Sequence, residues 1–229
     1  MIRDNIEAVK NDIAQICNRI KRDPMEITLV AVTKFAEVAQ ITEAVKAGLT
    51  HIGENRVQEG QRKFPEMDAA GLKTVKHLIG HLQTNKVKLA LQYFDLIQSV
   101  DSLKLAAEIE KQAQKLNRTI NILVQVSTSG EEQKFGVEHS QAIQLVEDIA
   151  KFEHINIQGL MTIAPLTDNK DIVRKCFSDL RLIRDQLQQN FSESGKVHMK
   201  YLSMGMSQDF TIALEEGANM LRIGSAIFK

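Results

Sequence analysis

The chain has 229 residues, of which 43% are hydrophobic and 25% charged, which is typical of one globular domain with one large core. Lysine plus arginine and aspartate plus glutamate number 29 each, so the formal net charge is zero and favours neither a nucleic-acid nor an anionic-membrane partner. The N-terminus lacks the apolar block of a signal peptide, and no uncharged run approaches the roughly 20 residues that span a bilayer, so we expect a cytoplasmic protein. Cys17 and Cys176 lack Cys-x-x-Cys spacing, and we expect two reduced packing residues and no metal site.

The first element is a helix, because apolar residues recur at three- and four-residue steps from Ile2 to Ile20. It reaches about Lys21 and is stopped by Pro24. Short apolar runs then alternate with helical stretches. The predicted strands are residues 28–33, 50–53, 75–80, 95–99, 120–127, 155–161, 198–203 and 219–223, and the predicted helices are residues 37–47, 56–63, 84–91, 102–116, 140–152, 170–190 and 208–216.

Strands that alternate with helices favour a parallel sheet with crossover connections. Eight such units in a chain of this length predict an α/β fold, namely a single (β/α)8 TIM-type barrel over residues 1–229 with an extra N-terminal helix. A doubly wound open sheet is the alternative, because periodicity does not distinguish a closed sheet from an open one.

The carboxyl ends of the strands are the place to look for chemistry in a barrel. Lys34 directly follows the first predicted strand. A lysine amine at the mouth of a buried strand is desolvated, which frees its lone pair to form a Schiff base with an aldehyde cofactor. The alternative is a surface lysine that ends the strand and pairs with a neighbouring carboxylate.

The last two strands end in small residues, hydroxyls and free backbone N–H groups, immediately before helical stretches. Such turns bind phosphate dianions, and the loops after strands seven and eight are a frequent phosphate site in barrels. Helix capping is the alternative reading of each turn. The two turns are Ser203-Met204-Gly205-Met206-Ser207 and Gly224-Ser225.

Arg222 alternates with residues that face the barrel mouth or interior, where an unpaired guanidinium is costly. Its partner is either an acceptor atom on a bound ring or one of Glu215 and Glu216 on the preceding helix. Asn55 is suited to hydrogen-bond a ring hydroxyl, or alternatively to cap the helix that opens at Arg56.

Two further residues have both a chemical and a structural reading. His81 is a candidate for proton transfer because of its residue type, or is a satisfied loop residue beside a glycine turn. Met161 packs on the face of a flat ligand or fills the top of the core.

Six ordered segments, which together extend over nearly the whole chain, resemble the pyridoxal phosphate homeostasis proteins. Those proteins are barrels related to the N-terminal domain of alanine racemase. The segments are residues 32–34, 52–59, 78–86, 159–163, 203–210 and 222–228.

The resemblance implies that Lys34 carries pyridoxal 5′-phosphate as a Schiff base and that Arg222 faces the pyridine nitrogen. It also implies that Asn55 lies near the ring, and Met161 is retained as a candidate to pack on the ring face. The turns around the phosphate are implied to be those of Ser203, Gly205, Ser207, Gly224 and Ser225.

The function implied by the resemblance is to hold pyridoxal phosphate and to buffer it or deliver it to apo forms of enzymes that use it, without strong catalysis. We expect a monomer or a weak dimer. One alternative is a weak amino-acid racemase in which Lys34 is one base and His81 or a water is the other. A second alternative is a regulatory module that reports the cofactor state to a protein partner.

Overall fold

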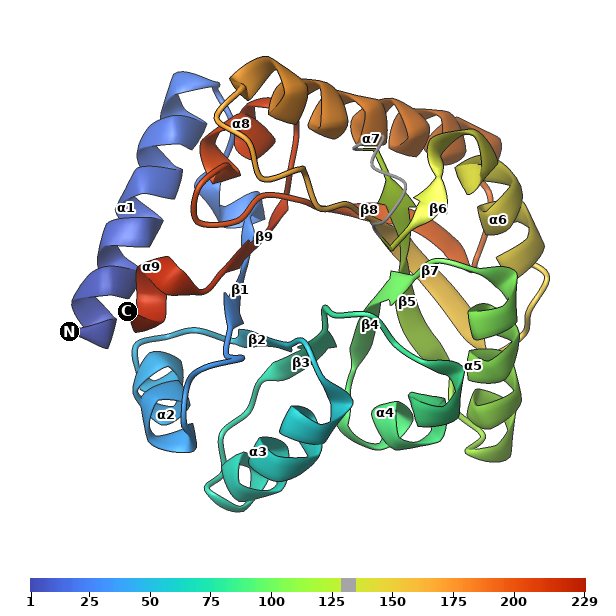
Figure 1. Ribbon diagram of the computed structural model, residues 1–229, viewed down its shortest axis with the longest axis horizontal. Coiled ribbons are helices and arrows are strands. Elements are labelled where there is room, and N and C mark those ends of the chain that lie inside the picture. The colour runs from blue at the N-terminus through green and yellow to red at the C-terminus, as the bar shows by residue number, and fades with distance from the viewer. Residues whose placement is uncertain (129–134) are drawn as a thin grey trace.

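The computed structural model, which describes residues 1–128 and 135–229, is a closed parallel barrel (Figure 1). Hydrogen-bonded neighbours follow the order β4-β3-β2-β1-β9-β8-β7-β5, and a further pairing of β4 with β5 closes the ring. The predicted barrel is confirmed, and the open-sheet alternative is wrong. The barrel strands are β1 (Thr28–Val32), β2 (His51–Glu54), β3 (Val75–Leu78), β4 (Leu96–Val100), β5 (Ile120–Ser127), β7 (Ile155–Met161), β8 (Val197–Ser203) and β9 (Met220–Ile223).

Helices surround the strands on the outside of the barrel (Figure 1). The longer helices are amphipathic, and their apolar faces belong to the main core, as the sequence periodicity requires. None of the helices in the described residues is both long and apolar enough to cross a membrane. The α-helices are α1 (Ile2–Arg19), α2 (Val38–Lys46), α3 (Val57–Ala69), α4 (Val87–Tyr93), α5 (Leu103–Lys115), α6 (Ala142–Ile149), α7 (Lys170–Asn190), α8 (Phe210–Glu215) and α9 (Ser225–Phe228), and three short 3₁₀ helices are η1 (Pro24–Glu26), η2 (Thr84–Lys86) and η3 (His139–Gln141).

The extra N-terminal helix, α1, belongs to this outer ring. It packs against α2, α8 and α9, and the Asn5 side chain donates a hydrogen bond to the carbonyl of Ile227 over 2.9 Å. The two termini therefore lie side by side in Figure 1. Because α8 and α9 are short, the long apolar face of α1 supplies the cover that this side of the barrel would otherwise lack.

Elements β6, α3 and α9 differ most from the sequence prediction. The two-residue strand β6 (Val137–Glu138) pairs with β5 outside the barrel and is too short to have a periodicity of its own. Helix α3 continues through Pro65 to Ala69, where the prediction ended at Lys63, because Phe64 and Met67 are buried on either side of the proline and hold the next turn against the barrel. The short helix α9 was not predicted.

The barrel interior contains both an apolar cluster and polar side chains. The apolar cluster joins inward-facing side chains from β1, β4, β5, β7 and β9: Val30, Leu96, Leu123, Met161 and Met220. His77, Gln98 and Ser203 are fully buried beside them. A larger apolar cluster, between the outer faces of the strands and the helices, forms the main core.

Candidate functional site

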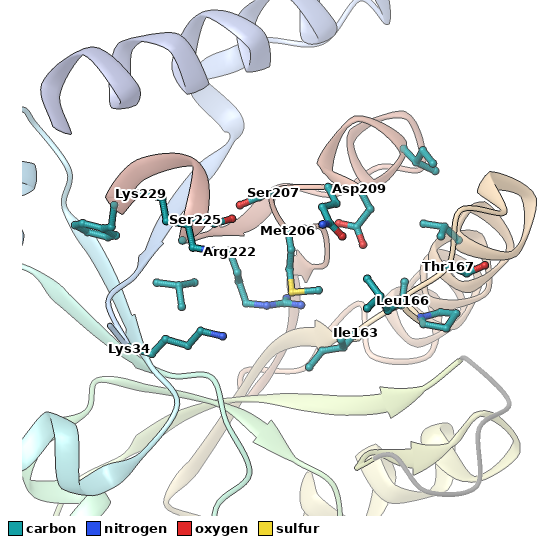
Figure 2. Close-up of a pocket in the computed structure, with 18 of the residues that line it drawn as sticks. Lys34, Ile163, Leu166, Thr167, Met206, Ser207, Asp209, Arg222, Ser225 and Lys229 are labelled. Atoms are coloured by element: carbon teal, nitrogen blue, oxygen red, sulfur yellow. Dashed lines mark hydrogen bonds between the residues drawn. The ribbon is translucent and has the colours of Figure 1, made fainter. Parts of the chain in front are cut away.

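A cavity of about 970 Å³ opens at the carboxyl ends of the strands (Figure 2). Its volume lies in the upper part of the range for small-molecule sites. It is lined from the ends of β1, β7, β8 and β9, which barrel closure makes neighbours. In Figure 2 the side chains of Lys34 and Arg222 extend into the same space, with Ile163, Met206, Ser207 and Ser225 around them.

Lys34 lies in the turn that follows β1 and lines the cavity. Its side chain is exposed, so the desolvation that the sequence argument invoked is wrong. Its Nζ lies 5.0 Å from the centre of the Phe35 ring and pairs with no carboxylate in the described chain. The side chain is at the surface, as the alternative of a strand-ending lysine expects, but no described carboxylate pairs with it.

Arg222, in β9, is 4% exposed and still lines the cavity. Its Nη1 donates to Ser203 Oγ over 2.7 Å, and its Nη2 donates to the carbonyl of Thr162 over 2.8 Å. Burial lowers the pKa of Arg222 to about 10, and the nearby Asp209 carboxylate opposes that shift. A guanidinium has five N–H donors, so donors remain for a ligand.

The two glutamates considered as partners of Arg222 lie elsewhere. Glu215 and Glu216 both pair with Arg174 of α7, and Glu215 also pairs with Arg19 of α1. The alternative that one of them pairs with Arg222 is wrong, because both carboxylates pair with arginines of the helix layer.

The two predicted phosphate turns lie together on the cavity wall. Ser207, Gly224 and Ser225 all line it, and the Ala226 N–H donates to Ser207 Oγ over 3.4 Å, which links the two turns. Within residues 1–128 and 135–229, the backbone N–H groups of Ser207 and Ser225 donate to no protein acceptor. Unpaired amides at the wall of a cavity are suited to bind an oxyanion.

Ser203 and Gly205 lie below this wall and do not line the cavity. Ser203 is fully buried and donates to Gln98 Oε1 over 2.6 Å while it accepts from Arg222. Gly205 has φ of 94°, and a Cβ there would lie 2.6 Å from the Cβ of Ala213. The two residues therefore support Arg222 and the turn from beneath.

Asn55 and His81 line a second, smaller cavity of about 420 Å³ near the ends of β2 and β3. The N-cap of α3 is Arg56, so the capping alternative for Asn55 is wrong. His81 stacks on Phe135 at 3.9 Å between ring centres, and its Nδ1 lies 3.7 Å from a carboxylate oxygen of Asp101. The structure does not bring these two residues to the cavity of Lys34.

Met161 is fully buried in the apolar cluster inside the barrel, which confirms the core alternative for this residue. The apolar residues on the cavity wall include Ile163 and Met206, which sequence reasoning missed because apolar loop residues have no distinguishing pattern. Asp209 was missed as well. It accepts from the Met206 N–H over 2.5 Å, and burial raises its pKa. Its one sequence signal is a carboxylate just before a helix.

A primary amine, a guanidinium and unpaired turn amides in one cavity are a donor set for an anionic aldehyde. Comparison with known proteins gives the class of this protein: the family described as "Alanine racemase, N-terminal domain" matches residues 5–229 of the sequence. Within that class, the chain belongs to the pyridoxal phosphate homeostasis protein family.

Relatives from several bacteria support the assignment. The pyridoxal phosphate homeostasis protein of Aquifex aeolicus (strain VF5) is 39% identical over 225 residues, which are 98% of this chain and 96% of the relative. A crystal structure of an unknown protein from Bifidobacterium adolescentis has a TM-score of 0.92 and 35% identity, and the match covers 99% of this chain and 94% of that one. The structure of PipY from Synechococcus elongatus PCC7942 with PLP bound has a TM-score of 0.84 and 31% identity over 100% of both chains.

Proposed function

We propose that this protein holds pyridoxal 5′-phosphate at the open end of its barrel, and buffers it or delivers it within the cytoplasm. The observation that carries the proposal is the shared cavity of the Lys34 amine, the Arg222 guanidinium and the unpaired turn amides. The PLP-bound structure of PipY, a full-length relative at 31% identity, supports the same ligand.

Each group in the cavity fits one part of this cofactor. The Lys34 amine would hold the cofactor through its aldehyde carbon. Ser207, Gly224 and Ser225 offer N–H and hydroxyl groups to the phosphate. Arg222 stays protonated at neutral pH, since its pKa lies at about 10, so it presents N–H donors to the ring nitrogen. Bound cofactor would supply an electrophilic carbon and an electron-accepting ring, and Arg222, which only donates, would leave that ring a weaker electron acceptor.

Holding the cofactor requires fewer groups than racemisation does. A racemase needs a second acid or base opposite the lysine. His81, the candidate for that role, lines the smaller cavity, and the described residues on the wall of the larger one include no histidine. The exposed Lys34 also leaves the bound aldehyde open to water and exchange, which suits a carrier.

Covalent labelling tests the proposal. Protein saturated with pyridoxal phosphate is reduced with borohydride, digested and analysed by mass spectrometry. We expect a pyridoxyl mass on the peptide that contains Lys34, and Lys34→Ala to lose both that mass and the visible absorbance of the bound cofactor. Lys170→Ala and Lys229→Ala are matched controls, because both are exposed lysines on the wall of the same cavity. An unlabelled Lys34, or a label that moves to Lys170 or Lys229 in the wild type, would overturn the proposal.

Delivery to an apo-enzyme is tested separately. Loaded protein is mixed with an apo-enzyme that requires pyridoxal phosphate, and activation is compared with that from free cofactor supplied at the measured release rate. Faster activation by the loaded protein supports direct transfer, and equal activation limits the protein to buffering. Sedimentation at several protein concentrations decides between a monomer and a weak dimer.

A further inference from the structure

A continuous chain of hydrogen bonds runs through the barrel interior from the cavity to the opposite end. Each member comes from a different strand: β9, β8, β4, β3 and β2. From the cavity downward, the heavy-atom distances are 2.7 Å, 2.6 Å, 2.8 Å and 2.9 Å, for the links that join Arg222, Ser203, Gln98, His77 and His51 in that order.

The chemistry of the groups gives this chain one direction. A guanidinium only donates, so Ser203 Oγ accepts a hydrogen bond from Arg222 and its own hydroxyl donates one to Gln98 Oε1. The amide NH₂ of Gln98 then faces His77 Nδ1, which must be the unprotonated nitrogen. His77 therefore carries its proton on Nε2 and donates it to His51 Nδ1.

The surroundings leave few substitutes for these bonds. Ser203, Gln98 and His77 are fully buried, and the apolar cluster of the barrel interior lies beside them. The only further described acceptor of the Gln98 amide is Met220 Sδ at 3.3 Å, a weak one. A broken link thus leaves a buried donor or acceptor unpaired, which is the costly case for a hydrogen bond.

Gln98 is the one member that fixes both halves of the chain. Its oxygen orients the Ser203 hydroxyl, which leaves the Ser203 lone pairs facing Arg222. Its nitrogen donates a hydrogen bond to the unprotonated Nδ1 of His77. A reversed amide would turn N–H groups toward Ser203 and set them against the guanidinium, which also only donates.

We infer that Gln98 is a positioning residue for the cofactor: through Ser203 it fixes which N–H groups Arg222 presents to the cavity, although Gln98 itself does not line that cavity. The inference rests on the proposed function for the identity of the ligand. The chain of hydrogen bonds is present in the protein without ligand.

The chain of hydrogen bonds is tested first in cofactor-free protein, by long-range ¹H–¹⁵N NMR of the histidine rings. In the wild type we expect His77 with its proton on Nε2. Gln98→Glu replaces the NH₂ by an acceptor, and we expect the His77 proton to move to Nδ1. Gln125→Leu is the matched control, since Gln125 is a buried glutamine on β5 whose amide donates to the carbonyl of Phe135 and has no link to Arg222.

The positioning role is tested by titration with pyridoxal phosphate, recording affinity and the absorption band of the bound cofactor. For Gln98→Leu we expect about tenfold weaker binding, which corresponds to one lost buried hydrogen bond. We also expect a shifted absorption band, because the position of the Arg222 guanidinium relative to the cofactor ring changes. For Gln125→Leu we expect the wild-type affinity and band. Ser203→Ala breaks the same chain one link higher and serves as the second variant if Gln98→Leu does not fold.

The outcomes separate the two proposals. Wild-type protein that takes up no cofactor on Lys34 overturns the proposed function and the positioning role with it, while the His77 tautomer still decides whether the chain exists. If the wild type binds, a folded Gln98→Leu with unchanged affinity and band overturns the positioning role alone. The same is true if Gln125→Leu reproduces the changes.

Discussion

His77 makes the acid stability of the protein sensitive to one buried side chain. Burial lowers its pKa from the ordinary 6.5 to about 3, and the neighbouring His51 adds to that shift. Between these values the unfolded chain binds a proton that the folded protein does not, so stability falls as the pH drops from about 6.5 toward 3. The slope is at most about 1.4 kcal/mol per pH unit from this residue.

We therefore predict that His77→Gln reduces the pH dependence of the free energy of unfolding between pH 6 and pH 4, by about 1 kcal/mol per pH unit. Urea unfolding at several pH values measures it. Part of the slope remains, because burial and Lys200 also lower the pKa of His51. His198→Gln is the control, since His198 is exposed on β8, and it keeps the wild-type slope. An unchanged slope in His77→Gln contradicts the prediction.

The sequence was sufficient to predict Lys34 and Arg222 as neighbours, because each lies at the carboxyl end of a strand in a closed barrel. It was not sufficient for Ser203, Gly205 and Met161. Whether a residue at a strand end lines the cavity or lies beneath it depends on the register between strands, and a shift of one residue changes the answer. The register between strands cannot be predicted from residue types alone.

At the scale of elements, a buried ion pair joins β1, β2 and α3 directly beneath the turn of Lys34. Lys63 Nζ donates to Glu54 Oε1 and to the carbonyl of Thr33, both over 2.8 Å. The Thr33 hydroxyl donates to the same Glu54 oxygen over 2.7 Å. Lys63 is 1% exposed and Glu54 is 0% exposed, so neither charge is compensated by water.

Removing Lys63 leaves the Glu54 carboxylate buried, with the Thr33 hydroxyl as its one remaining described donor. We predict that Lys63→Met lowers the free energy of unfolding by about 3–5 kcal/mol, as measured by urea unfolding. The double variant Lys63→Met with Glu54→Leu recovers much of the loss, because it removes both buried charges. Arg62→Met is the control, since Arg62 pairs with Glu37 and Glu59 at the exposed surface, and we expect a change below about 1 kcal/mol. If Lys63→Met lowers the free energy of unfolding by less than about 1 kcal/mol, the ion pair does not stabilise the contact between these elements.

The order and kind of the main elements followed from periodicity, whereas α3 and β6 show where periodicity fails. Pro65 is a helix-breaking signal, and only the burial of Phe64 and Met67 against the barrel overrides it. Strand β6 exists because its two residues pair with the end of β5, a tertiary contact with no local pattern.

At the scale of the whole molecule, closure of the barrel makes the cofactor site depend on the entire fold. Strands β1 and β9 come from opposite ends of the chain and pair in parallel, with Val30 beside Arg222 and Ala31 beside Ile223. Lys34 and Arg222 share a cavity only when this seam is formed. A ligand held by both residues binds the folded state and not the unfolded chain, so it stabilises the whole barrel by mass action.

We predict that pyridoxal phosphate at 100 times its dissociation constant adds about 2.7 kcal/mol to the free energy of unfolding. For a chain of this size that raises the midpoint of thermal unfolding by about 5–10 °C. Lys34→Ala abolishes the added increment because the covalent link is lost, whereas Lys170→Ala keeps it, since Lys170 is an exposed lysine on the same wall. Thermal unfolding followed by circular dichroism, with and without cofactor, measures all three proteins. Equal increments in Lys34→Ala and the wild type would show that the ligand stabilises the barrel from a site other than the seam between β1 and β9.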